Sequence, residues 1–207
     1  MDPPELPYLR AGIALFNEGY YLAAHEPWEE AWLQKPASDR NDCLQGLIQT
    51  AGAIHHATEG NNSGMIGLAE SAQSYLQECP NAIEPVQELQ NWLSQLVVTP
   101  TLAESSNPPK LVFNDRPIRI DDLQMRELLL AAEGLADTRD DSTLYRAVKL
   151  GELMTSKDDH PDFTSLIQSY MTTRNAGHRK RLSTKIEKHC QELEAVQNIF
   201  DEENNPE

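Results

Sequence analysis

The chain has 207 residues and a formal net charge of −16 at pH 7, and 39% of its residues are hydrophobic. This length suits one large domain or two small ones. No run of 18 apolar residues is present, and the first ten residues lack the basic and apolar regions of a secretory signal, so neither a membrane span nor secretion is expected. Cys43, Cys79 and Cys190 form no C-x-x-C pair, which favours reduced thiols and a cytoplasmic location.

The negative charge is concentrated in the first half of the chain. Residues 1–106 contain 3 Lys and Arg against 14 Asp and Glu, a net charge of −11, and the remainder has a net charge of −5. Such a surface repels phosphate backbones, so nucleic acid is not an expected partner. The one basic cluster, residues 174–189, lacks aromatic residues that could stack on bases, and it is interpreted as a solvated helix face.

Apolar residues at helical spacing predict five helices in the first half of the chain. Leu9, Ile13 and Phe16 mark the first helix, and Gly19 is expected to supply the left-handed residue that follows its end. The next four are expected over residues 20–33, 38–59, 63–78 and 83–98, with breaks at Pro36, Gly60, Pro80 and Pro100.

The second half begins after a stretch that is rich in Pro, Ser, Thr and Asn. Residues 99–112 are therefore predicted to be a linker between a helical bundle, residues 1–98, and a C-terminal region, residues 113–207. Two short β-like runs around Asn114-Asp115 suggest a small hairpin, and about four more helices follow. The predicted fold class is all-α, a bundle with antiparallel neighbouring helices plus an additional helical region whose role the sequence does not indicate.

The stretch AAHEPWEEAW, residues 23–32, carries the candidate chemistry. His25 and Glu29 are four residues apart, so their side chains share one helix face with Trp32, whereas Glu26 lies about 100° round the helix. Pro27 lacks an amide donor, which is harmless only in the first turn of a helix and otherwise kinks it.

The third predicted helix has a matching polar stripe. Gln45, Gln49, Gly52 and His56 follow one another at helical spacing, beside the apolar face of the same helix. Glutamines and a histidine in that position are expected to be partly buried and to need partners, which the His25 and Glu29 stripe could supply. Gly46 and Gly52 would let another helix approach closely.

These motifs resemble the bacterial and archaeal helical family catalogued as domain of unknown function 309, over residues 8–98. The resemblance rests on four short patterns: Phe16, Asn17, Gly19 and Tyr21; Ala24, His25, Glu26, Glu29 and Trp32; Gln45 to Gln49 with Ala51; and His56, Gly60, Asn61 and Gly64. Two features depart from the family pattern. Pro27-Trp28 replaces an aliphatic pair, and Thr58-Glu59 replaces basic residues, which argues against an anionic substrate.

The family is labelled in places a predicted metal-dependent hydrolase. This implies a metal site in the polar seam, the region where the His25 and Glu29 stripe faces the stripe of the third helix. A divalent metal such as Zn, Fe, Mn or Ni would be held by His25, Glu29 and His56, and Glu26 would act as general base on a bound water. Gln45, Gln49, Trp32 and Asn61 would support these residues. The zincin pattern, however, requires a second histidine where this chain has Glu29.

Two other interpretations of the same residues remain open. They can form a buried hydrogen-bond network that only fixes helix register, or a Glu–His pair that transfers protons without a metal. The sequence therefore predicts either a hydrolase that acts on a small molecule or a non-enzymatic interaction module that binds a protein. It indicates neither the substrate nor the oligomeric state.

Overall fold

The computed structural model describes residues 5–154 and 161–204. The chain divides into two compact units, Met1–Leu123 and Gln124–Glu207. Helices account for most of both units, and the only strands in the described residues are three short ones, so the predicted all-α class is confirmed. In the same part of the chain, no helix is both long enough and apolar enough to cross a membrane.

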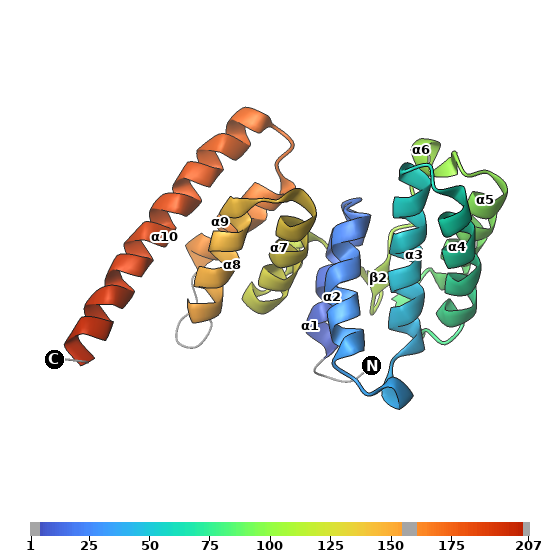
Figure 1. Ribbon diagram of the computed structural model, residues 1–207, viewed down its shortest axis with the longest axis horizontal. Coiled ribbons are helices and arrows are strands. Elements are labelled where there is room, and N and C mark those ends of the chain that lie inside the picture. Colours follow the sequence, from blue (N-terminus) through green and yellow to red (C-terminus); the bar gives the residue numbers. More distant parts are fainter. Residues whose placement is uncertain (1–4, 155–160, 205–207) are drawn as a thin grey trace. The chain divides into compact units, whose positions relative to one another are not determined.

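The first unit is a series of helices packed on their neighbours in the chain. Helix α2 lies between α1 and α3, α3 packs on α4, and α4 packs on α5 (Figure 1). The bounds of the larger helices are α1 Leu6–Asn17, α2 Tyr21–Leu33, α3 Asp42–Thr58, α4 Asn62–Leu76 and α5 Val86–Val98; the short elements are η2 Ala37–Asp39, α6 Leu102–Ser105 and η3 Ile120–Asp122.

The helix ends follow from local sequence. Helix α1 ends where Gly19 takes a left-handed conformation, φ +84°, as predicted, and the Tyr20 amide donates to the Leu15 carbonyl across this end. Helix α3 begins at the Asn41 cap, whose side chain accepts a hydrogen bond from the Leu44 amide. Gly46 lies directly against Leu76, so α3 and α4 meet with little side chain between them, as the glycine positions predicted.

A small antiparallel sheet joins two distant parts of the first unit. Strands β2 (Val112–Phe113) and β3 (Arg116–Pro117) form the suggested hairpin, and Asn114 and Asp115 both have positive φ in its turn. Strand β1 (Ile83–Glu84), which periodicity assigned to the fifth helix, pairs with β2 in the register Ile83 to Phe113. The unit therefore continues to Leu123 and includes the segment expected to be a linker.

Asn17 holds this hairpin against the end of α1. The buried side chain donates from Nδ2 to the carbonyls of Leu111, at 2.7 Å, and Ile118, at 3.0 Å. Its Oδ1 accepts from the Leu111 amide at 2.8 Å. One side chain thus satisfies three backbone groups that the irregular segment would otherwise bury without partners.

The sulfur chemistry differs from the sequence expectation. Cys43 and Cys79, 36 residues apart, form a disulfide, and Cys190 is a buried thiol in the second unit. The prediction of three reduced thiols is therefore wrong for two of them. The pairing depends on how α3 and α4 pack, which the spacing of cysteines along the chain does not reveal.

Within its described residues, the second unit has four helices around a core that includes Leu128, Leu144 and Phe163. They are α7 Met125–Arg139, α8 Ser142–Met154, α9 Pro161–Thr172 and α10 Ala176–Asn204. On α10, Leu182 and Ile186 are buried, whereas Lys180, Arg181 and Lys185 are exposed. The basic cluster is thus largely a solvated face, as predicted.

Asp141 links two helices of this unit. Its Oδ1 accepts hydrogen bonds from the Thr143 and Leu144 amides in the first turn of α8, and its Oδ2 accepts from the Tyr170 hydroxyl of α9 at 2.9 Å. Burial first, and then this hydrogen bond, raises the pKa of Tyr170 above its ordinary value. The hydroxyl therefore remains a donor over the physiological pH range.

We expect Asp141→Ala to lower the free energy of unfolding by about 2–3 kcal/mol, because it removes a helix cap and the charge-assisted hydrogen bond of the Tyr170 hydroxyl. Tyr170→Phe, which removes one hydrogen bond and keeps the cap, should cost about 1 kcal/mol. Urea unfolding followed by circular dichroism measures both. Equal effects of the two substitutions would show that the cap contributes nothing.

Candidate functional site

Helix α2 positions the side chains of the AAHEPWEEAW motif. Pro27 lies inside this helix, beyond its first turn, so the Ala23 carbonyl lacks its usual helical donor. Ala24 and Trp28 are buried, and they fix the opposite face of α2 in the core. His25, Glu26 and Glu29 are consequently left at the boundary between the buried and the exposed side of the helix.

The imidazole of His25 lies between two carboxylates. Its Nδ1 is 3.8 Å from Glu26 Oε1 and 3.8 Å from Glu29 Oε2. The His25 side chain is 24% exposed, and the two glutamates are 43% and 42% exposed. Nδ1 itself is buried and makes no hydrogen bond in the described residues, whereas Nε2 is not one of their buried unpartnered atoms.

The contact between His25 and Glu26 affects the pKa of the Glu26 carboxyl. The neighbouring His25 side chain is the main cause that lowers the pKa of this carboxyl, and partial burial acts against it. At 3.8 Å the contact is longer than a hydrogen bond, so a small rotation of either side chain is needed to form one. Glu26 is ionised at neutral pH and can accept a hydrogen bond from a protonated Nδ1.

The other side chains of the predicted seam are half-buried, and two carry unsatisfied atoms. Trp32 Nε1 and Gln49 Oε1 are buried without a hydrogen-bond partner, and Gln45 makes no side-chain hydrogen bond within the described residues. The Arg40 guanidinium covers the Trp32 ring, 4.0 Å from its centroid. The hydrogen-bond network that a purely structural seam requires is therefore not formed among these residues.

His56 has a different partner. Its Nδ1 is 3.1 Å from Asn61 Nδ2, and the Asn61 amide orientation is fixed because Oδ1 accepts from the Gly64 amide. The amide therefore donates to Nδ1, and the neutral ring carries its proton on Nε2. A metal needs an unprotonated imidazole nitrogen, so this arrangement leaves His56 without one.

Asn61 itself caps α4, and Gly60 supplies the left-handed residue between α3 and α4. A side chain at Gly64 would come within 2.7 Å of Asn61 Nδ2. The motif made of His56, Gly60, Asn61 and Gly64 thus builds the turn between two helices. It supports α3 and α4. Among the described residues, His56 makes no contact with His25 or with the carboxylates of Glu26 and Glu29.

The described residues contain no group of three or more His, Cys, Asp or Glu side chains placed to hold a metal ion. The residues fit such an ion poorly as they stand, because the His56 nitrogen is engaged by Asn61. The set of His25, Glu29 and His56 remains a prediction from the sequence.

A second polar cluster on α2 was missed by sequence reasoning. The Tyr8 hydroxyl of α1 donates to Glu30 Oε1 at 3.3 Å, and Gln34 Nε2 donates to the Tyr8 oxygen at 3.0 Å. Glu30 and Gln34 are four residues apart, which is a recognisable signal, but Tyr8 gives none. This cluster satisfies its own groups and ties α1 to the end of α2.

Comparison with known proteins adds a family to this geometry. Residues 9–68 match the family model described as Domain of unknown function (DUF309). The resemblance read from the motifs is thereby confirmed for α1 to the first half of α4, the region that holds every residue of the candidate site. The matched region ends before the hairpin that Asn17 binds.

One curated relative is similar to more than half of the chain. An uncharacterized protein of Aquifex aeolicus (strain VF5) is 29% identical over 112 residues, which cover 53% of this chain and 33% of that protein. The chain thus spans about a third of the length of this relative. No solved structure matches.

Proposed function

We propose that the DUF309 region is a small-molecule site of the hydrolase type, in which His25 transfers a proton. The observation that carries the proposal is the position of the imidazole, with Nδ1 facing two carboxylates at 3.8 Å in a side chain that is 24% exposed. A histidine held in this way by an acidic neighbour is the usual arrangement of a general base.

The chemistry follows from the tautomer that the carboxylates favour. Glu26 and Glu29 attract a proton to Nδ1, so the neutral ring presents its lone pair at Nε2. From there His25 can take a proton from a water molecule or a substrate hydroxyl. The two carboxylates then stabilise the imidazolium that forms, and the ring later returns the proton to the leaving group.

A divalent metal at His25, Glu29 and His56, with Glu26 as base, is the finer version of this proposal. It requires the His56 ring to give up its contact with the Asn61 amide. The alternative is an interaction module with a structural seam. Against it stand the unpartnered Nδ1 of His25 and Oε1 of Gln49, because a structural network normally satisfies its buried polar atoms.

The test compares His25→Gln with the parent protein for hydrolysis of uncharged p-nitrophenyl esters. We expect the parent to be active and the variant to lose about 100-fold or more of the rate, because general-base catalysis contributes typically 10²–10⁴-fold. The free energy of unfolding should change by less than about 1 kcal/mol, because Nδ1 makes no hydrogen bond to lose.

His55→Gln is the matched control, since His55 is a half-buried histidine of α3 that is not part of the group formed by His25, Glu26 and Glu29. It should keep the parent rate. Elemental analysis of untagged protein, purified without chelator, tests the metal version in parallel. An inactive parent together with a His25→Gln variant that unfolds more easily by several kcal/mol would support the structural seam instead.

A further inference from the structure

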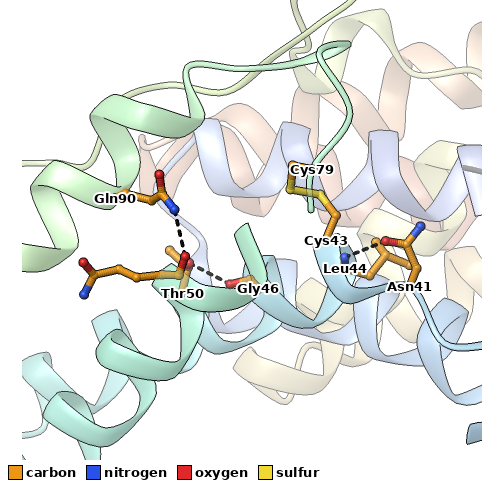
Figure 2. The surroundings of a disulfide bond; sticks show 8 residues. Asn41, Cys43, Leu44, Gly46, Thr50, Cys79 and Gln90 are labelled. Carbon is orange, nitrogen blue, oxygen red and sulfur yellow. Dashed lines mark hydrogen bonds between the residues drawn. A yellow bond between two sulfur atoms is a disulfide. The ribbon is translucent and has the colours of Figure 1, made fainter. Parts of the chain in front are cut away.

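The disulfide closes the end of the α3–α4 hairpin that lies opposite its turn. Cys43 is in the first turn of α3, and it is joined to Cys79 (Figure 2). Cys79 lies two residues after Gln77, which caps the end of α4. The Cα atoms of the two cysteines are 4.6 Å apart. The turn at Gly60 and Asn61 holds the other end, so the bond fixes the register of α3, which carries Gln45 and Gln49, against α4.

The two cysteine residues differ in their exposure. Cys43 is 1% exposed, whereas Cys79 lies in the less protected segment after α4 and is half-buried. Thiol–disulfide exchange begins when a thiolate attacks one sulfur in line with the S–S bond, so access decides which sulfur is attacked. An incoming thiolate therefore meets Cys79 first.

Attack at Cys79 makes Cys43 the leaving group, and its surroundings favour that role. Cys43 is the second residue of α3, after the Asn41 cap, where backbone N–H groups at the helix start give a partial positive charge. This end of the helix stabilises the thiolate that leaves. Asp42 is also in the first turn, but it is exposed and its charge is screened by solvent.

We propose that Cys43–Cys79 is a reversible thiol–disulfide exchange site that reacts with dithiol reductants through Cys79. A dithiol thiolate forms a bond to Cys79 Sγ while the Cys79–Cys43 bond breaks, and Cys43 leaves with the electron pair and takes up a proton. The second thiol of the reductant then attacks the mixed disulfide. The protein ends with two thiols and the reductant ends as a disulfide, so two electrons are transferred.

The inference goes beyond the proposed function and does not depend on it. The reduced protein should keep its fold, since Gly46 and Leu76 still hold α3 on α4 and the Asn41 cap does not involve sulfur. What changes is the restraint on the first turn of α3. The site would thus link the redox state of the surroundings to the α2–α3–α4 region.

The test uses the full chain, oxidised with glutathione disulfide and then treated with dithiothreitol in the absence of denaturant. Iodoacetamide alkylation and mass spectrometry count the thiols, while circular dichroism follows the helices. We expect the disulfide to form, and to be reduced within minutes with the helical signal retained. A bond that never forms, or that is reduced only after urea unfolds the chain, overturns the proposal.

Variants in which one cysteine of the pair is replaced test the direction of attack. In Cys43→Ser, the Cys79 thiol should form a mixed disulfide with glutathione disulfide about tenfold or more faster than the Cys43 thiol does in Cys79→Ser, because access limits the reaction. Cys190→Ser is the matched control and should leave the exchange of the Cys43–Cys79 pair unchanged. Faster reaction of Cys43 than of Cys79 would overturn the assigned direction.

Discussion

Asn17→Ala is expected to lower the free energy of unfolding of the first unit by about 3–6 kcal/mol, the largest effect of any single polar substitution proposed for this chain. The side chain makes three hydrogen bonds of 2.7, 2.8 and 3.0 Å, all to backbone groups of Leu111 and Ile118. Truncation leaves these groups buried without partners, and each unpaired group costs about 1–3 kcal/mol. Asn17→Asp should also destabilise, because a carboxylate cannot donate to the two carbonyls.

Urea unfolding of the full chain, followed by circular dichroism, measures this effect. The matched control is Asn91→Ala, at an exposed asparagine of α5 whose only side-chain hydrogen bond in the described residues is to the exposed Gln87. It should change the free energy of unfolding by less than about 0.5 kcal/mol. If Asn17→Ala behaved like this control, the hairpin would not depend on Asn17 for its position, and Asn17 would become a candidate for a direct role in function.

Periodicity was sufficient for the fold class but not for the boundary between the units. The spacing of Leu9, Ile13 and Phe16, with Gly19 after them, predicts α1 and its end from interactions within one helix. The extent of the first unit depends instead on Asn17 and on the pairing of Ile83 with Phe113, contacts between residues far apart in the chain. A Pro- and Ser-rich composition resembles a linker whether or not such contacts exist.

The candidate site was predicted in part for the same reason. Helical spacing alone places His25 beside Glu29, and the structure has this contact. The expectation that His56 joins them depends on how α2 packs against α3, which helical spacing within one helix does not give. Instead, the Asn61 side chain, five residues after His56, binds His56 Nδ1 within a local turn that Gly60 and Gly64 permit. The disulfide is the converse case, since 36 residues separate two cysteines that the α3–α4 packing brings together.

Gly12→Ala is the second substitution with a large expected effect, a loss of about 3–4 kcal/mol from overpacking and a disturbed hydrogen bond. An added Cβ would lie 2.1 Å from Trp28 Nε1 and 2.3 Å from its Cε2. Trp28 is fully buried, and its Nε1 donates to the Leu9 carbonyl at 3.3 Å. The ring therefore has to shift, which separates α1 from α2, the helix that carries His25.

Two further variants make this prediction specific to the Gly12–Trp28 contact. Gly67→Ala, on α4 where no atom approaches an added Cβ, should instead stabilise by about 0.5–1 kcal/mol, since glycine weakens a helix interior. Trp28→Leu provides space for the methyl group, so the double variant Gly12→Ala with Trp28→Leu should be less destabilised than the sum of the single variants by at least about 1 kcal/mol. Additive effects in thermal unfolding would mean that the cost at Gly12 arises elsewhere. A coupled effect would show that the close approach of α1 and α2, and with it the placement of the His25 face, depends on a glycine opposite this tryptophan.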